Sequence, residues 1–227
     1  MPAPLSGVKA CVFDAYGTLF DFASAARACP DVPPEAAERL SALWRDKQLQ
    51  YTWLLAAQGR HADFLQVTAD ALDFTLETLA LTRSALRERL LDLYLRLSPF
   101  PEVPETLARV RAAGLATAIL SNGTPAMLAA AVGAAGLNDL FDAVLSVEEV
   151  GAFKPDPRVY QLAVDRLGTP AASIAFVSSN GWDAHAASAF GIQVVWCNRY
   201  GQRRERLPGA PDREITTLAD LPALVGA

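Results

Sequence analysis

From about residue 100 to residue 197 the chain alternates regularly between helical patterns and short, continuously apolar strand patterns. The segments 115–120 and 173–177 show no polar alternation, which is typical of parallel strands that helices cover on both faces. Successive parallel strands need a helical crossover, so the pattern predicts an α/β fold with a Rossmann-like, doubly wound parallel sheet. We expect strands at about 8–14, 115–120, 143–146, 173–177 and 192–197, with helices at 102–113, 125–135, 157–167 and 183–190.

A long helical stretch follows the first strand before this alternation begins. The expected helices run from about 34 to 57, 62 to 79 and 83 to 97. A single helix is enough for a crossover, so a block of three predicts a separate unit. We therefore expect an α/β core domain made of residues 1–20 and 98–227, with residues 21–97 inserted as an α-helical cap subdomain.

The composition is that of a folded protein with no general attraction for polyanions. Of its 227 residues 52% are hydrophobic and 20% are charged, and the net charge is −5. This predicts neither nucleic acid nor a membrane as a partner. Residues 112–138 are uncharged, but the turn at 121–125 divides them into pieces too short to span a bilayer.

The cysteines and the N-terminus favour a cytoplasmic location. Cys11, Cys29 and Cys197 have no metal-ligand or redox spacing, so we expect reduced thiols. The first residues lack a basic segment followed by an apolar one, which argues against secretion.

The first predicted strand ends in a carboxylate and a glycine turn. Asp14 is followed by Tyr16, Gly17 and Thr18. Asp-x-Asp at this point would suggest metal-assisted phosphoryl chemistry, and Tyr16 removes one of its two acids. Asp14 is therefore a candidate nucleophile for an electrophile other than phosphate.

Polar residues follow four of the predicted strands. Because the carboxyl ends of parallel strands meet at one edge of a sheet, we expect these side chains to converge on one crevice. They are Asp14 and Thr18, Ser121 and Asn122, Lys154, and Ser178, Asn180 and Asp183.

These motifs resemble those of the haloacid dehalogenase (HAD) superfamily, and specifically its L-2-haloacid dehalogenase (type II) branch. The resemblance covers nearly the whole chain. The matching segments are Asp14-x-Tyr16-Gly17-Thr18, Leu120-Ser121-Asn122-Gly123, Lys154-Pro155-Asp156-x-x-x-Tyr160, Ser178-Ser179-Asn180-x-Trp182-Asp183, and residues 43–53 of the expected cap.

The resemblance and the chemistry of displacement together imply roles for the polar residues. Asp14 would displace halide from carbon, and the charge of Lys154 would keep it ionised. Ser121 and Asn122, with the amides that open the next helix, would anchor the substrate carboxylate, as would Thr18 with the amides of the preceding turn. Arg45 and Asn180 would receive the halide.

Hydrolysis of the resulting ester needs a base and residues that orient it. Asp183 is the candidate base, with Asn180 and Ser178 ordering it, and Tyr160 is expected to support Lys154 by a hydrogen bond. The apolar wall of the pocket is expected from Tyr16, Leu49, Phe64 and Trp182. Asp46 departs from the pattern of the branch, because an acid there would disfavour an anionic substrate unless it points away.

The predicted reaction is the hydrolysis of short L-2-haloacids to D-2-hydroxy acids with inversion, through an aspartyl ester on Asp14. It uses no metal and no other cofactor. The resemblance also implies a homodimer. Two alternatives stay open: a HAD-type phosphatase acting on a small phosphomonoester, and a non-catalytic binding protein on the same fold.

A serine hydrolase is disfavoured because the chain contains no Gly-x-Ser-x-Gly segment and only two histidines. Of these, His61 falls in the expected cap. His185 is expected on a helix surface.

Overall fold

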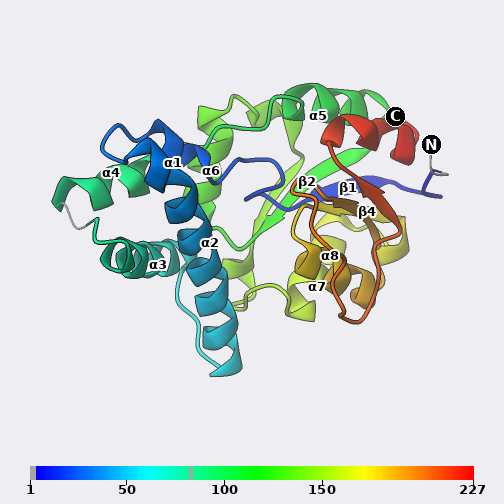
Figure 1. Cartoon of the computed structure of the whole chain (residues 1–227). Coiled ribbons are helices and arrows are strands. Elements are labelled where there is room, and N and C mark those ends of the chain that lie inside the picture. Colours follow the sequence, from blue (N-terminus) through cyan, green and yellow to red (C-terminus); the bar gives the residue numbers. More distant parts are fainter. Residues whose placement is uncertain (1–3, 82–83) are drawn as a thin grey trace.

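The computed structural model describes residues 4–81 and 84–227, and its strands form one parallel sheet (Figure 1). The strands are β1 (Ala10–Phe13), β2 (Ala116–Ser121), β3 (Ala143–Ser146), β4 (Ile174–Ser178), β5 (Gln193–Cys197) and β6 (Arg213–Ile215). Their order is β3-β2-β1-β4-β5-β6, and every neighbouring pair is parallel. The predicted fold class is confirmed.

The order of the strands explains where the site forms. β1 is fully buried at the centre of the sheet, and its last residue, Phe13, pairs with Ile119 of β2 and Val177 of β4. The strand that follows β1 in the chain, β2, lies on one side of the β1–β4 pair, and the strand that follows β4, β5, lies on the other side. The carboxyl ends of β1 and β4 therefore border the crevice at which ligands bind in sheets of this type.

Helices cover both faces of the sheet. They are α5 (Val103–Ala112), α6 (Pro125–Ala134), α7 (Pro157–Leu167), α8 (Gly181–Phe190) and α9 (Leu221–Val225). Figure 1 shows α5 and the C-terminal helix on one side of the sheet and α7 and α8 on the other. Side chains cap two of them: Thr124 accepts from the Met127 amide, and Asp156 accepts from the Arg158 amide. Helix α8 begins two residues before its predicted start.

The remaining helices form a block beside the sheet. They are α1 (Ser24–Ala28), α2 (Pro34–Ala57), α3 (Phe64–Thr78) and α4 (Ser84–Tyr94). Helix α2 has the predicted bounds, whereas α4 ends three residues early; Arg83, its expected first residue, lies outside the described residues.

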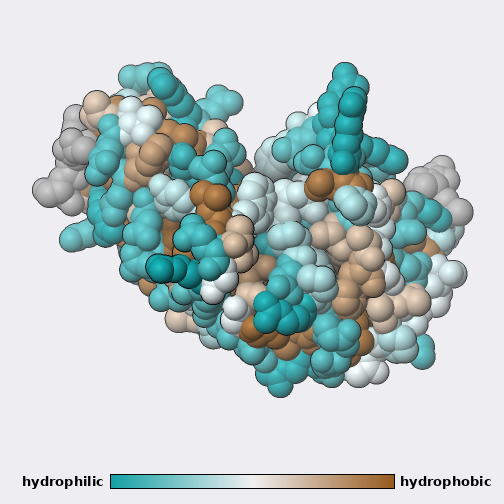
Figure 2. All heavy atoms as spheres, turned by 90° about the horizontal axis from the view of Figure 1, so that it is seen from below, coloured by the Kyte–Doolittle hydropathy of each residue, from teal (hydrophilic) through white to brown (hydrophobic). Residues whose placement is uncertain are grey.

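The two connections between the block and the sheet run side by side. The Asp21 amide donates to the Ser98 carbonyl, and Phe20 forms an antiparallel bridge with Pro99. Figure 2 shows the resulting two lobes, with a notch between them.

Two smaller expectations have different outcomes. Cys11, Cys29 and Cys197 are buried free thiols, as predicted. The expectation for His185 is wrong, because it is 4% exposed and its Nδ1 lies 3.3 Å from the carbonyl of Leu207 in a loop that covers α8.

Within the part of the chain that the structure describes, no helix is both long and apolar enough to cross a membrane.

Candidate active site

A small cavity of about 10 Å³ lies where the carboxyl ends of the strands meet the helical block. Both parts of the molecule contribute to its wall, because α2 supplies Arg45 and Leu49 and α3 supplies Phe64. The structure thus brings together the residues predicted to contact substrate, with the exception of Thr18. The lining residues are Asp14, Tyr16, Arg45, Leu49, Phe64, Ser121, Asn122, Lys154, Asn180 and Trp182.

The Asp14 carboxylate is buried and surrounded by hydrogen-bond donors. Its Oδ1 accepts from Lys154 Nζ at 3.1 Å. Its Oδ2 accepts from Thr18 Oγ1 at 3.1 Å and from Asn180 Nδ2 at 2.8 Å. The Thr18 hydroxyl is itself fixed, because it accepts from the Ser179 amide at 2.8 Å. These donors stabilise the charged carboxylate and fix its orientation.

Lys154 joins two carboxylates. Its Nζ lies 3.1 Å from Asp14 Oδ1 and 2.9 Å from Asp183 Oδ2, and its side chain is only 1% exposed. Burial by itself lowers the pKa of Lys154, but the two carboxylates outweigh this effect, so that its pKa is raised above the ordinary lysine value. The ammonium is therefore charged at neutral pH.

Asp183 lies behind the cavity wall and is completely buried. Its Oδ2 accepts from Lys154 and from Ser178 Oγ, each at 2.9 Å, and its Oδ1 accepts from Tyr160 Oη at 2.7 Å. Burial, which outweighs the opposing charge of Lys154, raises the pKa of Asp183, and the charge of Asp14 adds to the rise. A carboxyl group with a raised pKa is a stronger base once it is ionised.

Two predicted contacts in this group are wrong. The Tyr160 hydroxyl bonds Asp183 rather than Lys154, so any support of Lys154 is indirect. The Asn180 side chain bonds Asp14 rather than Asp183, which leaves Ser178 as the predicted partner that does contact Asp183.

Arg45 reaches from α2 to the edge of the sheet. Its guanidinium donates to Gln48 Oε1 at 2.9 Å, to the Tyr16 carbonyl at 3.2 Å and to Asn180 Oδ1 at 3.3 Å. Its Cζ lies 5.4 Å from the centre of the Phe22 ring. These partners are all neutral, and no carboxylate of the described residues is within ion-pair distance. The positive charge at the cavity wall is therefore uncompensated.

Tyr16 forms an aromatic wall. Its ring centre lies 5.4 Å from that of Tyr94 in a stacked arrangement and 5.8 Å from that of Phe64. Burial raises the pKa of Tyr16 well above the ordinary tyrosine value, and nearby Tyr94 adds to this effect, so its hydroxyl stays neutral.

Two donors remain available on the sheet side of the cavity. Ser121 Oγ accepts from the Gly123 amide, and Asn122 Oδ1 accepts from the Lys154 amide at 3.0 Å. Among the described residues, the Ser121 hydroxyl proton and the Asn122 Nδ2 group have no protein acceptor. Both can therefore donate to an anion in the cavity.

Two donors of the second predicted anion site are already used within the protein. The Gly17 amide donates to the Phe20 carbonyl at 2.7 Å, and the Thr18 hydroxyl donates to Asp14. These two groups are therefore not available to the substrate carboxylate.

Asp46 points away from the cavity. It is exposed and lines a hollow on the outer side of α2 together with Leu49 and Trp53. Its charge is consequently directed towards solvent rather than towards Asp14.

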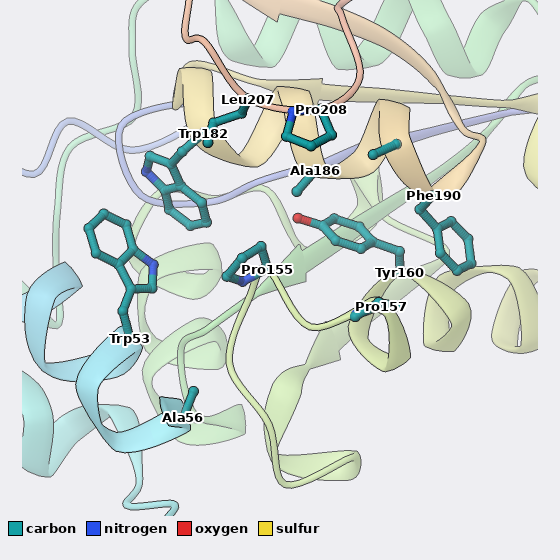
Figure 3. Close-up of a pocket in the computed structure, with 11 residues that line it drawn as sticks. Trp53, Ala56, Pro155, Pro157, Tyr160, Trp182, Ala186, Phe190, Leu207 and Pro208 are labelled. Atoms are coloured by element: carbon teal, nitrogen blue, oxygen red, sulfur yellow. The ribbon is translucent and has the colours of Figure 1, made fainter. Parts of the chain in front are cut away.

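Trp182 separates the cavity from an apolar groove on the surface (Figure 3). The indole of Trp182 on α8 meets that of Trp53 on α2 edge to face, with ring centres 5.4 Å apart. Pro155, Leu207 and Phe190 extend the groove along α7 and α8. The two tryptophans thus connect the helical block and the sheet beside the cavity.

Sequence reasoning missed two residues that contact the site, Gln48 and Tyr94. Gln48 is 1% exposed and bonds Arg45, and Tyr94 is 4% exposed and stacks on Tyr16. The available signal for Gln48 was an amide about one helical turn after Arg45, on the side of α2 that carries Leu40 and Trp44.

The parallel sheet, the buried aspartate after β1 and the lysine between two carboxylates define a hydrolase of the HAD type. A family model for haloacid dehalogenase-like hydrolases matches residues 8–191. The chain belongs to this family.

Similar proteins place it in the L-2-haloacid dehalogenase branch. An (S)-2-haloacid dehalogenase from Pseudomonas sp. (strain YL) is 48% identical over 93% of this chain and 91% of its own. A crystal structure of a dehalogenase with an intermediate complex has a TM-score of 0.95, with 42% identity over 98% of this chain and 99% of its own.

A third relative carries a bound group. The L-2-haloacid dehalogenase from Xanthobacter autotrophicus, with chloropropionic acid covalently bound, has a TM-score of 0.89 and 42% identity over 96% of this chain and 98% of its own. A HAD phosphatase from Thermococcus onnurineus, 24% identical with a TM-score of 0.62 over 95% of this chain and 96% of its own, shares the fold alone.

Proposed function

We propose that this protein hydrolyses short-chain L-2-haloacids to D-2-hydroxy acids, with inversion and through an ester on Asp14. One observation carries the proposal: an aspartate bound by Lys154, Thr18 and Asn180 borders a small cavity whose wall also holds Arg45, a cation with no carboxylate partner among the described residues. The cavity is small, about 10 Å³, which is far below the usual range for drug-sized ligands and favours a short chain. The relatives, which are (S)-2-haloacid dehalogenases, support the same substrate class.

In the first step a carboxylate oxygen of Asp14 attacks C2 of the substrate. The C2–halogen bond breaks, and the halide leaves with the bonding electron pair on the side opposite to the attack. Inversion follows from this single displacement. Ser121 and Asn122 donate to the substrate carboxylate, and Arg45 with Asn180 stabilises the charge that develops on the halogen.

In the second step water attacks the carbonyl carbon of the Asp14 ester. Asp183 takes a proton from this water and gives it to the alkyl oxygen as the bond between that oxygen and the carbonyl carbon breaks, and the second proton of the water is released when the Asp14 carboxylate re-forms. The 2-hydroxy acid leaves with an oxygen that belonged to Asp14, and the carboxylate regains an oxygen from water. Lys154, 3.1 Å from Asp14 Oδ1, stabilises the negative charge of the tetrahedral intermediate.

The reaction as proposed needs no metal. The oxygens of the two carboxylates are already bound by protein donors, namely Lys154, Thr18 and Asn180 at Asp14 and Lys154, Ser178 and Tyr160 at Asp183. Within the residues that the structure describes, no group of three or more His, Cys, Asp and Glu side chains is arranged to hold a metal ion. Halide release should therefore continue in the presence of a chelator, and its loss would contradict this part of the proposal.

A single turnover in ¹⁸O-labelled water tests the ester route. We expect unlabelled 2-hydroxy acid, with the label in the peptide that contains Asp14. Solvent label in the product of that first turnover would rule out the ester. Asp14→Asn should release no halide, and a product that retains the configuration of the substrate would exclude backside displacement.

One panel of substrates separates the alternatives. A HAD-type phosphatase would turn over an aryl phosphate with magnesium, and a binding protein would release neither phosphate nor halide. Tyr16 disfavours the phosphatase, because it leaves the site without a second acid beside Asp14 to protonate a leaving group.

We further propose a cytoplasmic homodimer in which residues 1–20 and 98–227 form the core domain and residues 21–97 the cap. The adjacent connections at Phe20 and Pro99 support this division. Exposed apolar side chains of α2 and α3, including Leu54 and Phe74, are suited to a contact between two copies. Light scattering coupled to size exclusion should give twice the mass of the 24.3 kDa chain, and a monomer at all concentrations would exclude the dimer.

A further inference from the structure

A buried amide lies behind the arginine of the cavity wall. Gln48 is 1% exposed in the interior of the helical block. Its Nε2 lies 2.7 Å from Thr68 Oγ1 and its Oε1 lies 2.9 Å from Arg45 Nη1, while the Tyr94 hydroxyl is within hydrogen-bond distance of both amide atoms. A buried glutamine is costly unless it is hydrogen-bonded, and here both ends of the amide have partners.

The neighbouring helix fixes the orientation of this amide. The Thr68 hydroxyl donates its single proton to the Phe64 carbonyl at 2.6 Å, so towards Gln48 it can only accept. The amide must therefore present its NH₂ group to Thr68 and its oxygen to Arg45. The hydrogen bonds alone set this orientation, because the reverse would place a carbonyl oxygen against an acceptor.

The oxygen that Gln48 presents to Arg45 is a hydrogen-bond acceptor without charge. A carboxylate at position 48 would also hold the guanidinium, but it would neutralise it at the wall of the anion-binding cavity. With the amide in place, Arg45 is held at Gln48, at the Tyr16 carbonyl and at Asn180, and its full positive charge faces the cavity.

We propose that Gln48 is a positioning residue for dehalogenation, which fixes the guanidinium of Arg45 at the cavity wall and leaves its charge uncompensated. Tyr94 extends this effect, because its hydroxyl bonds the same amide while its ring stacks on Tyr16 at 5.4 Å. The proposal rests on the proposed function of the cavity.

Three variants test it. Gln48→Met keeps the length of the side chain and removes the strong acceptor, whereas Gln48→Glu keeps the acceptor and adds a charge. Thr75→Val is the matched control, because Thr75 is buried on α3 and, among the described residues, its hydroxyl bonds only the Ala71 carbonyl. Each variant is compared with the wild type by melting temperature, kcat and KM for 2-chloropropanoate.

We expect Gln48→Met to lower kcat about 10- to 100-fold, the range expected when a group at the reacting centre is misplaced. Gln48→Glu should raise KM for the anionic substrate and also lower kcat, because it neutralises Arg45. Thr75→Val should keep the wild-type kcat and KM. Wild-type kinetics in a folded Gln48→Met protein would overturn the proposal.

A double-mutant cycle separates positioning from general stability. In an Arg45→Ala background, Gln48→Met should cause no further loss of kcat, because the group it positions is gone. An equal loss in both backgrounds would show that Gln48 acts only through the fold.

A crystal structure of Gln48→Met gives a readout that does not depend on the substrate. The Arg45 guanidinium should move away from the Tyr16 carbonyl and Asn180, but it should stay in Thr75→Val. An unmoved guanidinium would refute the positioning role even if the protein acted on another substrate. Absence of halide release by the wild type would instead refute the proposed function.

Discussion

Replacing Lys154 by methionine should destabilise the protein strongly near neutral pH. The ammonium lies 3.1 Å from Asp14 and 2.9 Å from Asp183, and the three side chains are 1%, 8% and 0% exposed. Removing one partner of a buried ion pair costs about 3–5 kcal/mol, since the other charge stays buried without compensation. For a chain of this length that corresponds to a fall in melting temperature of roughly 6–20 °C.

The loss should depend on pH in a definite direction. Burial and the charge of Asp14 raise the pKa of Asp183, and Lys154→Met removes the positive charge that opposes this rise. A carboxyl group with a raised pKa destabilises the folded state when it ionises, so the deficit is present at neutral pH and shrinks as the pH falls. In the wild type the pKa of Lys154 is raised, so its contribution is fully present below the ordinary lysine value of 10.5 and is lost only as the pH rises through the higher folded value.

Urea unfolding followed by circular dichroism, at neutral pH and at about pH 5, measures how the free energy of unfolding lost in Lys154→Met changes with pH. Lys9→Met is the matched control: it removes the same charge from an exposed lysine and should change stability by no more than about 0.5 kcal/mol. Adding Asp183→Asn to Lys154→Met should recover part of the loss. A Lys154→Met protein as stable as Lys9→Met near neutral pH, or a double variant without recovery, would refute the reasoning.

Three further substitutions have defined outcomes. Tyr160→Phe removes a donor that lowers the pKa of Asp183, so the acidic limb of the pH profile of kcat/KM should move to higher pH; an unmoved limb would argue against Asp183 as the base. Gly123→Ala would place a methyl group 2.9 Å from the Tyr16 hydroxyl and displace the aromatic wall of the cavity. Kinetics with the folded variant should show kcat/KM for 2-chloropropanoate lowered at least about tenfold. Gly209→Ala would put a Cβ against the backbone carbonyl of His185 in α8, at a φ of +78° that disfavours a side chain. The melting temperature of this variant should fall by an amount equivalent to more than about 1–2 kcal/mol.

The sequence alone predicts several of the helices and strands that position the site. Helix α2, strand β3 and helix α7 have the predicted bounds, because each combines a clear apolar pattern with a sharp start or stop. The predicted substrate contacts other than Thr18 line one cavity for two geometric reasons. The carboxyl ends of parallel strands meet at one edge, and residues four apart on a helix, such as Arg45 and Leu49, face the same way.

The elements that the pattern missed are short or depend on tertiary pairing. Strand β6 has three residues, two of them charged, and it exists through its pairing with β5. Helices α1 and α9 have five residues each, which is too few to show an amphipathic pattern in the sequence.

The partners of individual side chains were the least predictable part of the site. Sequence reasoning placed Tyr160 near Lys154 and Asn180 near Asp183, and both residues do lie in this cluster. Which acceptor each donor selects depends on rotamers and on distances of a few tenths of an ångström, and sequence spacing does not specify these. Gln48 illustrates the same limit, since its role depends on the direction in which Thr68 donates.

The charges of the site explain why the side chain at position 16 matters. Asp14 and Asp183 both pair with Lys154, Arg45 has no carboxylate partner among the described residues, and the raised pKa of Tyr16, caused mainly by burial, keeps its hydroxyl neutral. An acid in place of Tyr16 would add a negative charge where both the substrate carboxylate and the departing halide need a positive one. A neutral, stacked aromatic ring therefore fits displacement on an anionic haloacid, whereas phosphoryl transfer would lack its second acid.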